Sequence, residues 1–315
     1  MAFQTNATDH LIRSSLWSTQ LKEVLLDDLM AMAYVDLITD FPDGDTLNIP
    51  SIGQAEVYDY AEGQAIRYTA MDTGNFTFSI TDYKASATAI TNKMKQDSYV
   101  MSQLVSSFVP KQNRAIMKSM EAAILALGPG AQTLNSDNQI NGAKHRFIGS
   151  GTNETMSVND FARALYALQK ANVPATNLVA IVDPSVEYAV NTITNISNVS
   201  NNPQWDGIVS SGISSGMRFI KNIYGFDVYT SQNLKSNSAS ETINSVTSTV
   251  GVNNLFFSAA PDVVPFIGAI RQAPTVDSSY NKDRQQDEYV TTCRYGFKLY
   301  RPENMVVVVT DTDQV

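Results

Sequence analysis

The sequence predicts an α+β fold, and three observations lead to this prediction. Residues 46–60 and 65–80 favour β-strands on either side of the sequence Ala-Glu-Gly-Gln at 61–64. Apolar residues at helical spacing occupy the regions before and after this pair of strands. Residues 152–272 then alternate between strand-like and helix-like segments. Hydrophobic residues make up 43% of the 315 residues, which is enough to form a core.

Residues 1–40 are predicted to form an N-terminal arm. Within it, residues 9–37 have the pattern of an amphipathic helix, which ends before Pro42 and Gly44. The alternative is an ordinary surface helix. The apolar positions at roughly helical spacing are Leu11, Leu16, Leu21, Val24, Leu25 and Leu29.

Residues 41–83 are predicted to form an extended β-hairpin loop. Two sets of residues share one parity and therefore one face, namely Ile66, Tyr68 and Ala70, and Phe76, Phe78 and Ile80. Pro50 and Gly53 suit a kinked edge strand, and residues 72–75 suggest a bend or bulge. Each arm of about 15 residues spans about 50 Å, whereas a compact chain of this length has a radius of gyration of about 20 Å. The hairpin is therefore expected to overhang its own subunit and to lie on a neighbouring chain.

Residues 84–151 are predicted to contain a long helical region, 84–127, that is interrupted at Pro110. Its second part carries an apolar stripe and ends near Gly128. Residues 129–156 are rich in Gly, Asn and Ser and predict a loop or a short hairpin. The stripe consists of Ile116, Met117, Met120, Ala123, Ile124 and Leu127.

Residues 152–272 read as an α/β unit and residues 273–315 as closing strands. Ser157 and Asp160 predict the cap of a helix that ends before Pro174. A buried strand follows at 178–182, with Asp183 as the cap of the next helix. Residues 226–234 and 253–270 are expected to supply further strands and a helix, and residues 235–251 a polar surface loop. Residues 287–300 are expected to pair with 304–310 in a hairpin around Arg301.

The sequence shows no set of residues typical of an active site or a metal site. Ser214 lies in a G-x-S-x-G pattern, but both histidines, His10 and His145, precede it. Cys293 is the only cysteine and lies in a predicted strand, where an inert buried thiol is expected. The D-x-D pairs at 43–45 and 311–313 lack the loop of a calcium site. We therefore expect no catalytic residue, no cofactor and no metal.

The net charge of −9 and the lack of a basic stripe argue against tight binding to nucleic acid. Free duplex DNA is expected to bind weakly at physiological salt. A titration with short duplexes tests this prediction, and a submicromolar affinity would contradict it.

The single cysteine suits a reducing cytoplasm. The sequence contains no apolar run long enough to predict a membrane span.

The order of these parts resembles the major capsid protein of tailed bacteriophages, with the Hong Kong 97-like fold. The sequence GDTLNIPSIG at 44–53 resembles the entry into that family's extended loop. The run 78–100 is similar to the exit from the loop into the spine helix, as in short-tailed phages. Residues 178–190 are similar to the strand and helix of the axial domain, and residues 287–309 to the closing strands of the peripheral domain.

The resemblance implies a structural subunit that self-assembles as hexamers and pentamers into an icosahedral shell enclosing double-stranded DNA in the virion. Its partners are further copies, a portal, a separate scaffolding protein and, in some shells, a decoration protein. Some members join subunits covalently through a lysine of the extended loop, but residues 44–83 contain none. Other members carry about a hundred additional N-terminal residues that act as a scaffold. In this sequence the arm begins almost at once, so a separate scaffolding protein is implied. Assembly in the host cytoplasm and procapsid maturation are also implied.

Five residues of the extended loop are the expected inter-subunit contacts: Glu56, Tyr58, Asp59, Arg67 and Tyr68. Among them, the unlike charges of Glu56, Asp59 and Arg67 lie near the tip and can pair across a subunit boundary. Three alternatives to a phage capsid remain at this point. One is an encapsulin-type nanocompartment, which shares the fold. The others are a tail or receptor-binding protein of a phage, and an enzyme, which the absence of catalytic motifs disfavours.

Overall fold

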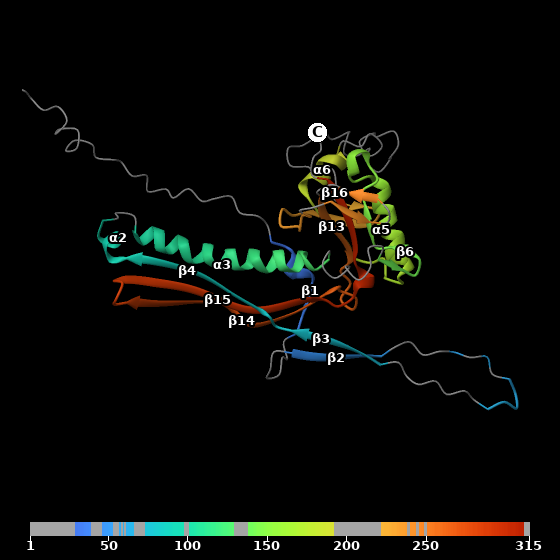
Figure 1. Cartoon of the computed structure of the whole chain (residues 1–315), viewed down its shortest axis with the longest axis horizontal. Coiled ribbons are helices and arrows are strands. Elements are labelled where there is room, and N and C mark those ends of the chain that lie inside the picture. Colours follow the sequence, from blue (N-terminus) through green and yellow to red (C-terminus); the bar gives the residue numbers. More distant parts are fainter. Residues whose placement is uncertain are drawn as a thin grey trace, which may run out of the picture.

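The computed structural model describes residues 29–38, 46–52, 57, 59, 61–65, 73–97, 101–128, 138–191, 222–237, 240–243, 246–248 and 251–311. Three parts are visible in Figure 1: an elongated part in which α3 runs along β4, β14 and β15, a compact domain that contains α5, α6, β13 and β16, and a two-stranded ribbon of β2 and β3 that passes beneath the compact domain. The predicted α+β class is confirmed.

The elongated part is a four-stranded sheet in the order β1-β14-β15-β4, with α3 packed on one face. Gln112 of α3 bonds to Thr88 of β4 and to Thr291 of β15. A buried cluster of Ile116, Met120, Cys293 and Tyr295 fixes helix to sheet. The elements of this part are η1 (Ala31–Tyr34), β1 (Val35–Leu37), β4 (Asp82–Thr91), α2 (Asn92–Asp97), α3 (Met101–Leu125), β14 (Phe266–Asn281) and β15 (Gln286–Leu299).

The compact domain is a six-stranded mixed sheet in the order β7-β16-β13-β8-β10-β9. Phe161 of α5 and Phe226 of β10 both pack edge to face on Phe256 of β13 at the centre of its core. The elements of this domain are β5 (Gln139–Ile140), β6 (Ala143–Lys144), β7 (Arg146–Ile148), η3 (Thr152–Glu154), α5 (Val158–Lys170), β8 (Leu178–Val182), α6 (Pro184–Asn191), β9 (Asn222–Ile223), β10 (Phe226–Thr230), β11 (Glu241–Ile243), β12 (Val246–Ser248), β13 (Gly251–Ser258), η6 (Pro302–Asn304) and β16 (Val306–Asp311).

Three predictions from local sequence patterns are confirmed in this domain: the cap of α5, the start of α6 and the hairpin of β5 and β6. Asp160 accepts the backbone N–H of Ser157 at 2.9 Å, which completes the predicted cap of α5. Asp183 accepts the backbone N–H of Ser185 at 2.9 Å, and α6 begins at Pro184 as expected. β5 and β6 form the short hairpin predicted within 129–156. These signals succeed because each depends on residues close together in the chain.

The prediction of a helical region from residue 84 is wrong for its first part. Residues 82–91 form β4, which pairs along its whole length with β15, from Asp82 opposite Tyr295 to Thr91 opposite Gln286. Ala, Ser and Thr permit either structure, and pairing with a distant strand decides the outcome. Pro110 does not interrupt the helix either, because α3 runs continuously through it with Pro110 exposed. Met117, predicted in the apolar stripe, is exposed.

The predicted hairpin of 287–300 with 304–310 is also wrong. β15 pairs with β14 and β4, whereas β16 pairs with β13 and β7 in the other sheet. The turn at η6 therefore carries the chain from one sheet to the other. The predicted boundary between residues 272 and 273 falls inside β14.

Four smaller predictions also differ from the structure. Residues 31–37 form η1 and β1 rather than the end of a helix, because β1 pairs in parallel with β14. Residues 235–251 are not only surface loop: β11 and β12 pair within them, and Ile243 is buried against Ile148 and Val309. Residues 259–265 contain a turn and no helix. Residues 73–75 belong to a regular strand without a bulge.

Candidate inter-subunit interface

The described base and tip of the ribbon share one antiparallel register. β2 (Thr46–Ile52) pairs with β3 (Thr73–Ser79), and the residue numbers of every pair add to 125. The numbers of Ala61 and Gln64 also add to 125, and the Gln64 N–H donates to the Ala61 carbonyl at 3.1 Å. Gly63 has φ +89°, as a type II turn requires at its third position. The predicted turn at 61–64 is therefore confirmed.

The base of the ribbon is anchored on its own subunit. Phe78 and Ile80 are buried against Ile267 and Ala269 of β14, with Ile49 and Phe76 packed around them. Because Ile267 faces away from Phe266 and the core beneath α3, the ribbon lies on the opposite face of the sheet from the helix. The expected common face of Phe76, Phe78 and Ile80 is confirmed.

Lys298 adds a polar attachment to this apolar anchor. Its Nζ donates to the Thr77 carbonyl at 2.7 Å and lies 4.5 Å from the centre of the Phe76 ring. The Phe76 ring in turn packs edge to face on Tyr300, with ring centres 5.0 Å apart. The side chains of Lys298, Phe76 and Tyr300 thus hold β3 against the C-terminal end of β15.

Ser79 and Ile80, where the chain passes from the ribbon to the four-stranded sheet, lie against Gly296 of β15. A Cβ atom at this position would lie 2.8 Å from the Ser79 carbonyl oxygen and 2.9 Å from the Ile80 Cα. Both are backbone atoms, so a side chain here cannot be accommodated by a rotamer change. Gly296 is what permits the ribbon to lie directly on β15.

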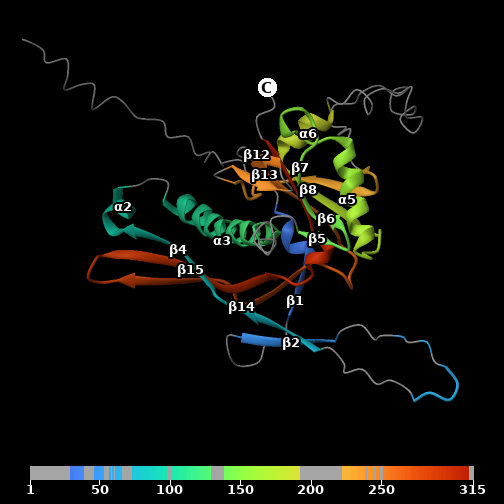
Figure 2. The ribbon, with the colours of Figure 1, turned by 45° about the vertical axis from the view of Figure 1, so that its right-hand side comes forward.

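The outer part of the ribbon extends away from the rest of the subunit. Figures 1 and 2, which differ by a 45° rotation, both place the turn at 61–65 beyond the edge of the compact domain. Residues 61–65 are exposed, and the side chain of Val57 is 94% exposed. Of the five expected contact residues, Asp59 is exposed on this extension. The other four, Glu56, Tyr58, Arg67 and Tyr68, lie outside the described residues, and so do Ser214 and His10.

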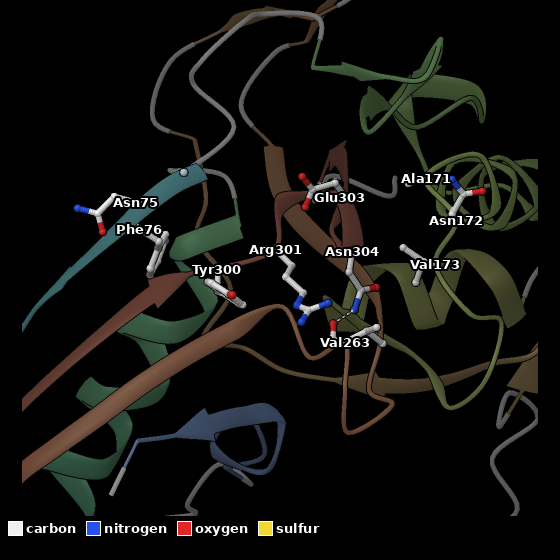
Figure 3. Close-up of a pocket in the computed structure, with 11 residues that line it drawn as sticks. Asn75, Phe76, Ala171, Asn172, Val173, Val263, Tyr300, Arg301, Glu303 and Asn304 are labelled. Carbon is white, nitrogen blue, oxygen red and sulfur yellow. Dashed lines mark hydrogen bonds between the residues drawn. The ribbon is translucent and has the colours of Figure 1, made fainter. Parts of the chain in front are cut away.

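A cleft of about 730 Å³ separates the ribbon from the compact domain. One wall is Gly74, Asn75 and Phe76 of β3, and the opposite wall is residues 171–173, which directly follow α5. Between them lie Val263 and the segment 300–304, with the Arg301 side chain in the middle of the residues drawn (Figure 3). The cleft is thus a corner formed where the ribbon leaves the body.

His145 is buried and interacts with Glu303, one of the residues that line this cleft. Burial lowers its pKa below the ordinary value of 6.5, although the backbones of Ala143 and Glu303 and the Glu303 carboxylate act in the opposite direction. Its Nδ1 lies 3.2 Å from the Ala143 carbonyl oxygen. The neutral imidazole is therefore the form that the folded protein favours.

Stability is expected to fall as the pH is lowered below 6.5, the ordinary pKa of histidine. Below pH 6.5 the unfolded chain binds a proton at His145 more readily than the folded chain does, so the free energy of unfolding decreases by up to about 1.4 kcal/mol per pH unit. Thermal melting of the wild type and of His145→Asn would show a shallower pH dependence in the variant. Equal slopes would contradict the assignment.

The described residues contain no group of three or more His, Cys, Asp or Glu residues able to hold a metal ion. Cys293 is buried, and burial raises the pKa of its thiol. None of the helices in the described ranges is both long and apolar enough to cross a membrane.

The sequence does not predict the contact of Lys298 with the ribbon, or the cleft. A lysine between the apolar residues Phe297 and Leu299 is a signal that the face it occupies meets something polar. That its partner is a backbone carbonyl of the ribbon, more than 200 residues earlier, has no counterpart in the sequence pattern.

Comparison with known proteins is informative at the level of family and fold. A family model described as phage capsid protein matches residues 75–308. No curated protein matches the chain by sequence.

Solved structures of phage capsids match almost the whole chain. A Mycobacterium phage Che8 structure is 18% identical with a TM-score of 0.67, covering 93% of this chain and 95% of that one. The bacteriophage PhiM1 mature capsid is 9% identical with a TM-score of 0.72, covering 96% and 93%. The cyanophage Pam1 capsid is 13% identical with a TM-score of 0.71, covering 97% and 98%. At these identities the likeness establishes the fold.

Proposed function

We propose, for a chain that belongs to the phage capsid protein family, that it assembles into its shell by laying its ribbon on the next copy. The family and the fold predicted from the sequence are confirmed, and with them a structural role in the virion rather than an enzymatic one. Family membership also favours the phage shell over the encapsulin-type compartment.

The observation that carries this proposal is the contrast between the two ends of the ribbon. The base is buried at Phe78 and Ile80 on the subunit's own sheet. The tip at 61–65 is exposed and lies beyond the compact domain. A two-stranded ribbon is marginally stable alone in water, so a second copy beneath it is the natural support.

The finer parts of the proposal come from the resemblance to tailed-phage capsid proteins. The four-stranded sheet with α3 acts as the peripheral domain and the six-stranded sheet as the axial domain, with hexamers and pentamers as the assembly units. A separate scaffolding protein and a portal complete the shell. With a net charge of −9, double-stranded DNA is held by confinement rather than by affinity.

Electron microscopy of the protein after co-expression with its scaffolding protein tests the proposal. Closed shells, or isolated hexamers and pentamers, are expected. A strictly monomeric protein under these conditions would overturn it.

Shells boiled in detergent are expected to run as single chains of 34.5 kDa. Residues 44–83 contain no lysine, so the loop has no amine for an isopeptide bond. Denaturing gel electrophoresis gives the answer directly, and a ladder of covalent multimers would show that the chains are joined at another site.

A further inference from the structure

We propose that the cleft between the ribbon and the compact domain receives the same neighbouring copy on which the ribbon lies, with Arg301 and Glu303 as its charged contacts. The inference rests on the proposed function, because it assigns a second contact to the same interface. Each subunit then has two sides. The donor side carries the ribbon and the cleft, and the receiving side contacts the donor side of another copy.

The charges in the cleft are available for a partner. The Arg301 guanidinium lies 5.4 Å from the centre of the Tyr300 ring, and neither Arg301 nor Glu303 forms an ion pair within the described part of the chain. Both residues are exposed. Two opposite charges two residues apart, neither of them ion-paired within the described residues, suit a surface that carries both signs.

The walls of the cleft point to a protein rather than to a small molecule. Sites for small ligands are mostly apolar with a few polar groups. Here Asn75 and Asn172 stand on opposite walls, with Arg301 and Glu303 between them. The volume of about 730 Å³ is enough for several side chains of a neighbouring surface.

The position of the cleft selects the occupant. Gly74, Asn75 and Phe76 form one wall, and the same ribbon then continues outward to its exposed tip (Figure 2). A copy that supports the outer ribbon must stand beside the compact domain, and so at the mouth of the cleft. Because the interface joins two different surfaces, it closes a ring when repeated by rotation.

Mixing experiments with two variants test this assignment. The first variant replaces residues 54–70 by a short Gly/Ser linker and so lacks the donor contact of the ribbon. The second, Arg301→Glu with Glu303→Arg, reverses both charges of the cleft at unchanged net charge. Since both side chains are exposed, its melting temperature is expected to match that of the wild type. Exchanging the exposed charges at the β14–β15 turn, Lys282→Glu with Asp283→Lys, is the matched control.

Association with the tagged ribbon-deleted chain is measured by sedimentation. Wild-type and control chains are expected to bind it, because their intact donor side meets its intact receiving side. The cleft variant is expected to bind it at least tenfold more weakly, since both chains then have a defective donor side. Binding as tight as that of the wild type would overturn the cleft assignment alone. If the wild type itself fails to bind, the ribbon contact of the proposed function falls, and the cleft assignment with it.

Discussion

A chain in which a short Gly/Ser linker replaces residues 54–70 is expected to fold as a soluble monomer and to fail in assembly. The deletion leaves β2 and β3 intact, and with them the buried contacts of Phe78 and Ile80. Long exposed excursions contribute little to the stability of a domain, whereas every neighbour loses its ribbon contact. Thermal melting read alongside light scattering separates the two effects.

The matched control for this deletion is Glu62→Ala at the exposed turn. If Glu62 pairs with a charge of the neighbouring copy, that exposed pair contributes under about 1 kcal/mol, so the single change is expected to weaken assembly at most and not to abolish it. Loss of cooperative melting in the deletion variant would mean that the ribbon is packed on its own domain.

Phe78→Ala is expected to lower the free energy of unfolding by about 3–5 kcal/mol, because it leaves a cavity at the base of the ribbon. Phe78 is fully buried, and its cluster is the apolar contact between the ribbon and β14. Chemical denaturation measures the change, and the exposed neighbour Ser79→Ala is the control, with an expected effect within about 0.5 kcal/mol. A loss below about 1 kcal/mol for Phe78→Ala would show that the ribbon is not anchored there.

These two experiments separate the functions of one hairpin. The inner part, at β2 and β3, contributes to the stability of the subunit that carries it. In the proposed function, the outer part contributes to the contact with a neighbouring copy. The change from one to the other occurs at the cleft, where Phe76 still packs on Tyr300 and the ribbon leaves the body.

The features that the sequence predicts well are those determined by neighbouring residues. The cap at Ser157 and Asp160, the strand and helix around Asp183, and the turn at Gly63 each depend on residues within a few positions. The alternation of Phe76, Phe78 and Ile80 identifies the buried face of the ribbon in the same way.

The features that the sequence predicts poorly are those determined by distant pairing. Residues 82–91 are a strand because β15 lies beside them, and without that partner their Ala, Ser and Thr content permits a helix. The strands β15 and β16 are close in the chain, yet η6 directs them to different sheets. Met117 has helical spacing with the buried stripe of α3 but lies at its margin.

The candidate interface follows the same rule. The length of the ribbon predicts that it overhangs, and the location of its tip agrees with that prediction. Lys298 and the cleft require the crossing of the ribbon over β15 at Gly296, which brings residues 74–80 against residues 296–304. No spacing within the sequence indicates that crossing.

The central claim, that the ribbon lies on a second copy, is tested most directly by a photo-cross-linkable amino acid at Glu62. This residue is exposed at the ribbon turn. Irradiated shells are expected to yield a species of twice 34.5 kDa on a denaturing gel, with the cross-link joining the turn to a peptide of another copy. Mixing isotope-labelled and unlabelled chains before assembly shows whether the cross-link is intermolecular, because only then can it join a labelled peptide to an unlabelled one. A cross-link confined to the same chain would show that the ribbon folds back on its own subunit and would contradict the account.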